Sequence, residues 1–319
     1  MQERIVLTGL GHLGKIHLKL LHESKCWKLA GVFDIDQNLT RELALKYQVK
    51  AFNTLAEAID HCDAMAIVTP GNTHYEIAKS CIMAGKHVFV EQPVTSELKE
   101  AYLLKKLAQE AGVAIQVGHV ERFNPAYQAA LPYLKEPVLI EIQRLATYNV
   151  RGTDVSVVKD LSLHDIDLLL RTVKANVRKI SAKGTTFISR SADVLNARIE
   201  FDNGCVASII TNRISFNNER SFRAFTADHL INIDLLNKVS EIIEVRNATP
   251  DSKQTVIDPG MGLPKKELSH KYPTVHSNNA INEELNSFYK SINEGFPIAV
   301  SIDDSIKVME VLQAIEELI

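Results

Sequence analysis

Three polar side chains recur at helical spacing between residues 160 and 167. Asp160, His164 and Asp167 stand at positions i, i+4 and i+7, so an α-helix would place them on one stripe. An imidazole titrates near neutral pH, so His164 suits a base that takes the proton of a hydroxyl as hydride leaves its carbon, with Asp160 orienting it. The pattern therefore indicates alcohol oxidation. Taken alone, it fits a helix capped by Asp160 with a half-buried histidine better.

A glycine-rich loop near the N-terminus is the second segment whose residue types suggest chemistry. It follows a predicted strand, opens a predicted helix, and consists of Gly9, Leu10, Gly11, His12, Leu13 and Gly14. In dinucleotide-binding domains such glycines permit a tight turn and a close backbone approach to the pyrophosphate, and the helix N-terminus offers N–H groups to the anion. Asp34, at the end of the next predicted strand, suits the ribose hydroxyls. The two signals together predict a dinucleotide site; a structural turn beside a solvated aspartate is the alternative.

The residues around the loop also favour NAD over NADP. The Asp34 carboxylate would repel a 2′-phosphate, and Ile35 and Asp36 supply no cation to hold one. Ligands of open parallel sheets bind beyond the carboxyl ends of the strands, so two further strand ends are expected to contribute to the cofactor site. Their residues are Thr69, Pro70, Asn72 and His74 after one strand, and Glu91 and Gln92 after another. Asn72 has a second interpretation, as the N-cap of a helix.

Residues 1–120 alternate short β-branched runs with longer helical patterns, as βαβ units of a parallel sheet do. Strands are expected at residues 4–8, 29–34, 64–69, 87–90 and 114–117, with a weaker one at 50–52. A helix is expected at residues 96–111, where apolar side chains recur at helical spacing. The fold predicted for this part is an α/β Rossmann domain that binds NAD.

Residues 121–319 are predicted to form an α+β domain with a large, mostly antiparallel sheet. Alternating strands are expected at residues 138–146, 194–201 and 206–214, and Asp202-Asn203-Gly204 between the last two is a strong hairpin signal. A helix is expected at residues 163–173 and a loop at 258–264. The helical pattern at 302–319 suits packing on either domain.

The bulk composition excludes several classes of protein. The chain has 319 residues, of which 45% are hydrophobic and 24% charged, as in ordinary globular proteins. A formal charge of −3 gives no electrostatic case for binding nucleic acid. The four cysteines are scattered and no HExxH occurs, so we expect neither a metal site nor a disulfide framework. Since we find no signal-peptide layout and no apolar run of membrane-spanning length, we expect a cytoplasmic protein without membrane partners.

On these motifs the chain resembles the Gfo/Idh/MocA oxidoreductases over essentially its whole length. The matching segments are residues 9–14, 69–74, 91–93, 118–125, 160–167 and 201–205. The resemblance implies an NAD(P)-binding Rossmann domain, a second domain that carries the substrate, and Asp160 and His164 at the reacting centre. Residues 144–167 are also similar to the UDP-N-acetylglucosamine 3-dehydrogenases of that family. This implies oxidation of a ring hydroxyl, C3, of a nucleotide sugar to a ketosugar, in a homo-oligomer (dimer or tetramer) assembled through the C-terminal sheet.

Gln92 is the main departure from the family pattern. The usual triplet is Glu-Lys-Pro, and the resemblance gives its lysine a contact with the reacting hydroxyl and the nicotinamide. Gln92 can hydrogen-bond a hydroxyl, but it cannot stabilise a developing alkoxide by charge. Two rival functions therefore stay open. One is a catalytically weak NAD(H)-binding regulator, and the other is a glycosidase that oxidises its sugar transiently with a retained NAD.

A nucleotide sugar would also require groups that bind its phosphates. Guanidinium groups suit a bidentate grip on phosphate, and arginines cluster in the segments that flank the predicted site. The candidates for substrate binding are Arg122, Asn124, Arg144, Arg151, Asp167 and Arg213, with Arg220 and Arg223 nearby. The alternative is that several of these arginines lie on the exposed sheet face or pair across an oligomer interface.

Overall fold

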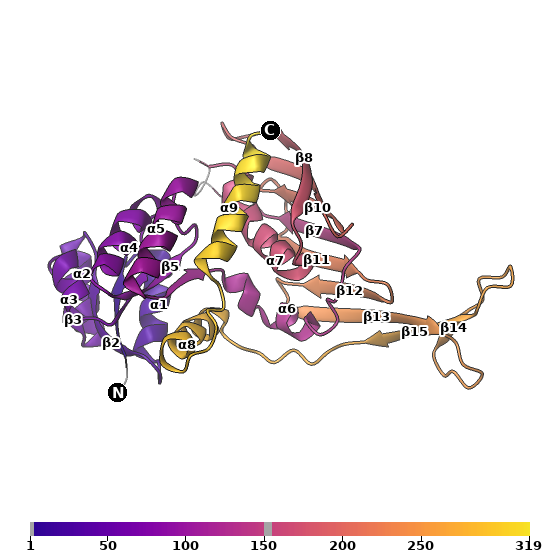
Figure 1. Cartoon of the computed structure of the whole chain (residues 1–319), viewed down its shortest axis with the longest axis horizontal. Helices are drawn as coiled ribbons and strands as arrows, with labels where there is room; N and C mark the ends of the chain where they lie inside the picture. Colours follow the sequence, from indigo (N-terminus) through magenta and orange to yellow (C-terminus); the bar gives the residue numbers. More distant parts are fainter. Residues whose placement is uncertain (1–2, 150–154) are drawn as a thin grey trace. The chain divides into compact units, whose positions relative to one another are not determined.

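A computed structural model describes residues 3–149 and 155–319 of the chain (Figure 1). The chain divides into two compact units. The first comprises Met1–Val120 together with Asn279–Met309, and the second comprises Glu121–Asn278 together with Glu310–Ile319. Arg151 lies outside the described residues.

The first unit is built on a six-stranded parallel sheet with the order β3-β2-β1-β4-β5-β6. Its strands are β1 (Arg4–Thr8), β2 (Lys28–Phe33), β3 (Lys50–Ala51), β4 (Ala64–Ile67), β5 (His87–Glu91) and β6 (Ile115–Gly118). Its helices are α1 (His12–His22), α2 (Gln37–Tyr47), α3 (Leu55–Asp60), α4 (His74–Met83), α5 (Leu98–Ala111) and α8 (Ala280–Asn293). The strand order reverses beside β1, as in dinucleotide-binding folds, which confirms the predicted Rossmann architecture.

Helix α8 corrects the predicted domain organisation, which assigned residues 121–319 as a whole to the second domain. Its buried side chains Leu285 and Phe288 belong to the same core as Trp27 and Phe89. The Trp27 indole N–H donates to the Leu285 carbonyl oxygen at 3.0 Å. The physical reason is the apolar face of the helix, which the sheet of the first unit buries. Apolar residues at helical spacing in residues 281–292 were the available signal for this helix.

The second unit is built on a nine-stranded sheet with the order β14-β15-β13-β12-β11-β7-β10-β9-β8. Its strands are β7 (Leu139–Leu145), β8 (Val177–Thr185), β9 (Val194–Phe201), β10 (Val206–Asn212), β11 (Glu219–Phe225), β12 (His229–Asp234), β13 (Val239–Asn247), β14 (Thr255–Ile257) and β15 (Lys266–Lys271). All neighbouring pairs are antiparallel except β7 and β10. The predicted mostly antiparallel sheet is confirmed.

Three local predictions for the second unit are also confirmed. Gly204 adopts a φ of +88° in the turn that joins β9 to β10, which explains the Asp-Asn-Gly signal. Helix α7 (Leu163–Val173) has the predicted bounds. Residues 258–264 connect β14 to β15 without regular structure. Helix α6 (Pro125–Ala130) contacts β12 and β13, and α7 contacts β7, on the sheet face that carries the buried side chains (Figure 1).

Helix α9 (Ile302–Glu316) crosses the division of the chain, because residues up to Met309 belong to the first unit and later residues to the second. Among residues 3–149 and 155–319, no helix is long and apolar enough to span a membrane. Within the same described ranges, no three His, Cys, Asp or Glu side chains are arranged to hold a metal ion.

Candidate cofactor and catalytic sites

The glycine-rich loop has three glycines with different packing. A Cβ at Gly9, where φ is +89°, would overlap the Val68 carbonyl, and a Cβ at Gly14 would overlap the Gly9 carbonyl. A Cβ at Gly11 would meet no atom within 4 Å. Two of the glycines are therefore required by the fold of the loop itself. Gly11 instead leaves an open approach to the backbone at the N-terminus of α1, where free N–H groups could donate to an anion.

Asp34 is fixed beside this loop at the end of β2. Its Oδ2 accepts the Leu10 N–H at 2.6 Å, and its Oδ1 accepts the Asp36 N–H at 2.9 Å. Asp36 in turn caps α2 by accepting the N–H groups of Asn38 and Leu39. The carboxylate that the sequence assigns to the ribose is thus held in place by the backbone, and Ile35 beside it is exposed.

A cavity of about 540 Å³ runs along these elements. The predicted cofactor residues that line it are Gly9, Gly11, His12, Leu13, Asp34, Thr69 and Pro70. Apolar side chains such as Ile35, Leu39 and Ile77 complete its wall. An open backbone at a helix N-terminus, a fixed carboxylate and an apolar wall are what the pyrophosphate, ribose and adenine of a dinucleotide require. The residues present therefore fit NAD.

Three other predicted cofactor residues, Leu10, Asn72 and His74, are not among those that line this cavity. His74 is buried, and its two ring nitrogens lie 2.8 Å from the carbonyl oxygens of Pro93 and Thr69, so it ties together the ends of two strands. Asn72 is exposed in a short turn, and the N-cap of α4 is Thr73, so Asn72 is not that cap. Leu10 is fully buried in the core.

Glu91 is the last residue of β5 and Gln92 follows it, but their surroundings differ. The Glu91 carboxylate lies 2.9 Å from Nε2 of the buried His17 on α1, and a Cβ at Gly118 would overlap it. Its Oε2 also accepts the Gln92 N–H at 3.3 Å. Glu91 therefore anchors the end of the strand to α1. Gln92 is half-buried and is joined to Pro93 by a cis peptide bond.

The proposed base occupies the first turn of α7, and the segment before it departs from prediction. His164 and Asp160 are both half-buried, but Val158–Ser162, which include Asp160, form a π-helical turn. A π-helix closes i→i+5 hydrogen bonds, so the assumed α-helical spacing of Asp160 and His164 is wrong there. Single π turns of this kind are frequent at functional sites. The Ser162 hydroxyl donates to Thr211 Oγ1 at 2.9 Å and ties the turn to β10.

Three of the arginines that the sequence assigned to substrate phosphates are buried in ion pairs within the second unit. Arg122 pairs with Asp167, Arg144 with Asp165 and Arg213 with Asp193, at 2.6 to 2.8 Å. A guanidinium that is buried on a carboxylate is expensive to separate from it. Asp167 is the buried partner of Arg122, so separating it from that pair to bind substrate would be equally expensive. These contacts give Arg122, Arg144 and Asp167 a structural role in holding α7 to its neighbours, and Arg213 a structural role in holding Asp193 and Val155 beside the end of β10.

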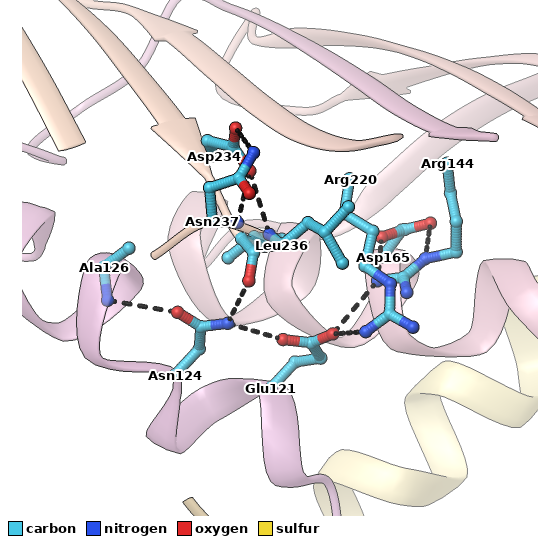
Figure 2. Close-up of polar contacts among 10 residues, drawn as sticks. Glu121, Asn124, Ala126, Arg144, Asp165, Arg220, Asp234, Leu236 and Asn237 are labelled. Atoms are coloured by element: carbon cyan, nitrogen blue, oxygen red, sulfur yellow. Dashed lines mark hydrogen bonds and ion pairs between the residues drawn. The ribbon is translucent and has the colours of Figure 1, made fainter. Parts of the chain in front are cut away.

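The Asn124 side chain also makes its hydrogen bonds within the second unit. Its Oδ1 accepts the Ala126 N–H as the N-cap of α6, and its Nδ2 donates to Glu121 Oε2 at 3.0 Å and to the Leu235 carbonyl at 2.9 Å (Figure 2). Arg220 is different, because its side chain is 45% exposed while its Nη1 lies 3.2 Å from Glu121 Oε1. Arg223, half-exposed as well, pairs with Glu141.

Glu121 is the residue that sequence reasoning missed, although the Gly118–Pro125 motif contains it. It is 7% exposed. Its carboxylate accepts hydrogen bonds from Asn124 Nδ2 and Arg220 Nη1, and it lies 3.5 Å from Arg144 Nη2 (Figure 2). Burial raises its pKa, but Arg144, His164 and the other partners outweigh burial, so the net pKa is lowered. These partners therefore favour the ionised form of Glu121.

The partners of Glu121 show opposing electrostatic effects. Burial lowers the pKa of Arg144, but Asp165 and Glu121 outweigh burial and the pKa rises. Burial raises the pKa of Asp165, and the bidentate contact with Arg144 at 2.7 and 2.8 Å opposes that rise. These two charge-assisted bonds favour the ionised form of Asp165, but burial is the larger effect and the net pKa of Asp165 is raised.

Comparison with known proteins gives consistent similarities. Residues 3–119 match the Gfo/Idh/MocA model, described as an oxidoreductase family with an NAD-binding Rossmann fold. Over 269 residues the chain is 32% identical to the UDP-N-acetylglucosamine 3-dehydrogenase of Acidithiobacillus ferrooxidans, a match that covers 83% of this chain and 84% of that protein. The scyllo-inositol 2-dehydrogenase (NAD(+)) of Bacillus subtilis is 30% identical over 238 residues, 67% of this chain and 68% of that one.

A solved structure of a related protein has a fold similar to that of this chain. UDP-N-acetylglucosamine 3-dehydrogenase GnnA from Acidithiobacillus ferrooxidans has a TM-score of 0.90 with this chain at 28% identity. That similarity covers 100% of this chain and 98% of the GnnA chain. The likeness therefore includes both units.

Proposed function

This chain belongs to the Gfo/Idh/MocA family of NAD-binding oxidoreductases that act on CH–OH groups, and we propose that it oxidises a ring hydroxyl, C3, of a nucleotide sugar such as UDP-N-acetylglucosamine. The observation that carries the proposal is the similarity to a UDP-N-acetylglucosamine 3-dehydrogenase over both units, at 32% sequence identity and a TM-score of 0.90. The product is the corresponding ketosugar.

The first unit supplies the cofactor cradle and the second supplies the acid–base group. Bound NAD provides a hydride acceptor. An imidazole nitrogen of His164 takes the hydroxyl proton while the C–H electron pair leaves with the hydride, so the carbon becomes a carbonyl. Asp160, in the π-helical turn before α7, orients His164 and favours its charged form. The sugar loses two hydrogens in total, one as hydride and one as a proton.

Gln92 gives this enzyme a weaker electrostatic contribution than a lysine would. Its amide can donate to the reacting hydroxyl oxygen, but it leaves the developing negative charge on that oxygen without a cation. We therefore propose that proton removal depends on His164 more than in relatives with Glu-Lys-Pro. Gln92 also supports the second candidate function, an NAD(H)-binding regulator with weak catalysis.

The phosphate contact is proposed for Arg220 rather than for the buried arginines. Arg122, Arg144 and Arg213 would have to leave buried carboxylates, whereas Arg220 is half-exposed on the same sheet face as Arg144. Arg151 stays a proposed substrate residue on its sequence context alone.

We also propose a homo-oligomer assembled through the sheet of the second unit. Leu139, Val206 and Ile210 are only half-buried on the face opposite to the buried side chains of β7 and β10. These apolar side chains alternate with polar ones such as Glu141, Gln143 and Ser208, and a mixed face of this kind suits contact with a second copy of the chain. Light scattering after gel filtration would give a multiple of 35.6 kDa, and Val206→Glu would lower that mass.

The direct test is NADH absorbance when the purified protein and NAD are mixed with a panel of sugars that includes UDP-N-acetylglucosamine, alongside His164→Gln. The proposal expects NADH with the nucleotide sugar and its loss in the variant. Reduction of the product with borodeuteride and mass spectrometry would locate the label at C3. NAD binding without turnover on any sugar would favour the regulator, and release of free sugar without net NADH would favour the glycosidase.

A further inference from the structure

Glu91, the last residue of β5, has a hydrogen-bond partner on each of its carboxylate oxygens. Its Oε1 lies 2.9 Å from Nε2 of His17 on α1, and its Oε2 accepts the Gln92 N–H at 3.3 Å. The side chains of His17 and Glu91 are 0% and 11% exposed. An ionised carboxylate only accepts hydrogen bonds, so Nε2 of His17 is the donor. Glu91 therefore links α1 to the residue that follows β5.

His17 belongs to the helix that begins at the proposed pyrophosphate cradle. It lies on the buried side of α1 together with Gly14, three positions before it. Gly14 in turn packs so closely on the Gly9 carbonyl that a Cβ would overlap it. A side chain that is bound to His17 is thus held in a fixed position relative to the glycine-rich loop.

Two neighbours restrict this arrangement further. Phe89 leaves β5 on the same face as Glu91, and its ring centroid lies 5.7 Å from that of His17. Gly118 pairs with Glu91 in the ladder of β5 and β6, and a Cβ at Gly118 would lie 2.6 Å from Glu91 Oε2. The glycine therefore leaves the space that the Glu91 carboxylate occupies.

The order of the sheet explains why a side-chain link is useful here. The glycine-rich loop continues from β1, whereas Gln92 continues from β5. Strand β4 lies between β1 and β5, so the two strand ends are not paired with each other. The contact between His17 and Glu91 spans that separation.

Histidine at position 17 has a cost that an apolar residue would avoid. Among the residues that the structure describes, Nδ1 of His17 is buried and has no hydrogen-bond partner. An unpaired buried polar atom is destabilising, and a leucine would fill an apolar site of similar size without it. The use of histidine therefore indicates that the Nε2–H donor is required.

We propose that His17 and Glu91 are positioning residues, which hold the main chain of Gln92, and with it the Gln92 amide group, in a fixed place relative to the glycine-rich loop. Hydride transfer needs a narrow range of geometries, and a misplacement of about 1 Å can cost about 100-fold in rate. The loop holds the cofactor and Gln92 meets the reacting hydroxyl, so the link keeps the two aligned. The inference rests on the proposed role of Gln92, and it adds two residues that act through Gln92.

The first test follows the Gln92 N–H by NMR in the full-length protein with isotope-labelled glutamine. The Gln92 signal is the one absent from Gln92→Met. His17→Leu removes the donor and should shift this signal, although the two residues are far apart in the sequence. His17→Gln, whose amide can donate to Glu91, should restore it.

The matched control for this measurement is His87→Leu. His87 lies at the opposite end of β5, where its Nδ1 accepts the Ala114 N–H at 3.0 Å. The control thus removes a histidine that binds through its ring on the same strand, and it should leave the Gln92 signal and kcat unchanged.

Steady-state kinetics with the active nucleotide sugar give the second readout. His17→Leu should lower kcat about tenfold or more and change the KM for NAD less than about threefold, because the glycine-rich loop is intact. His17→Gln should recover most of the loss. The melting temperature of His17→Leu should change little, since the variant removes an unpaired buried nitrogen along with the hydrogen bond. A merely structural role would lower the melting temperature and leave kcat of the folded protein unchanged.

An unchanged Gln92 signal in His17→Leu, or a loss of kcat that His17→Gln fails to recover, would overturn the inference. If His17→Leu does not fold, Gly118→Ala decides, because its Cβ displaces the Glu91 carboxylate and should likewise lower kcat. The NMR readout needs no turnover. A protein that oxidised no sugar would therefore count against the proposed function, while the Gln92 signal would still decide whether His17 positions Gln92.

Discussion

Arg122 and Asp167 form a buried ion pair in which Nε and Nη2 of the arginine donate to both carboxylate oxygens, at 2.6 to 3.1 Å. Their side chains are 7% and 1% exposed. Asp167 lies on α7 one turn after His164, so this pair fixes the helix that carries the proposed base.

Removal of one partner of this pair should destabilise the fold. Asp167→Ala leaves the Arg122 guanidinium buried without its carboxylate, which costs about 3 to 5 kcal/mol. The free energy of unfolding from chemical denaturation measures this. Glu141→Ala breaks the exposed pair with Arg223 and should cost less than about 1 kcal/mol. Equal losses in the two variants would show that burial of the pair has no bearing on stability.

Gly11 and Gly14 should separate cofactor binding from folding. A Cβ at Gly11 meets no protein atom within 4 Å, so Gly11→Ala should keep the melting temperature and yet obstruct the pyrophosphate, with an NAD affinity at least about tenfold lower. Calorimetric titration with NAD and thermal melting measure the two effects. Gly14→Ala should lower the melting temperature, because its Cβ would overlap the Gly9 carbonyl. Full NAD affinity in Gly11→Ala would contradict the assigned cradle.

Gln92→Lys should increase turnover. The ammonium group would restore a cation beside the developing alkoxide, and a gain in kcat of about tenfold or more is expected from such a charge. Steady-state NADH formation with the active nucleotide sugar measures it. Gln92→Met, similar in size and without hydrogen-bonding capacity, is the control and should reduce kcat. An unchanged kcat in Gln92→Lys would mean that the Gln92 side chain does not approach the reacting oxygen.

Asp193 should make stability depend on pH in the acid range. Burial raises its pKa, but the N–H groups of residues 187–189 and the Arg213 guanidinium outweigh burial and hold the pKa well below its usual range. Because the native pKa is lowered, the stabilisation is complete above the unfolded-state value of about 3.9 and is lost as pH falls through the native pKa.

Comparison with Asp193→Asn isolates this contribution. The variant should be less stable than the natural protein by about 3 kcal/mol at neutral pH, because Arg213 loses its buried partner. The difference should narrow as the pH falls below about 4, because Asp193 of the unfolded natural chain then begins to take up a proton, while the folded form does so only at lower pH. Denaturant unfolding across the pH range measures it. A difference that stays constant down to the lowest accessible pH would contradict the assignment to Asp193.

The sequence by itself determined the features that depend on local backbone geometry and on side-chain periodicity. Gly9 to Gly14 with Asp34 predicted the Rossmann turn, because only glycine fits a positive φ and a close helix approach there. The Asn203-Gly204 turn predicted the β9–β10 hairpin, and apolar spacing predicted α7 to the residue. These patterns depend on a few neighbouring positions, so they can be recognised in the sequence alone.

Only the tertiary structure decided which charges are available for chemistry. Arg122, Arg144 and Arg213 look alike in the sequence, but each is buried on an aspartate brought from 20 to 45 positions away. The π turn at Asp160 and the union of α8 with the first unit also depend on contacts across the fold. Burial and pairing of a charge are set by what packs around it, and a free guanidinium and a neutralised one have the same one-letter code.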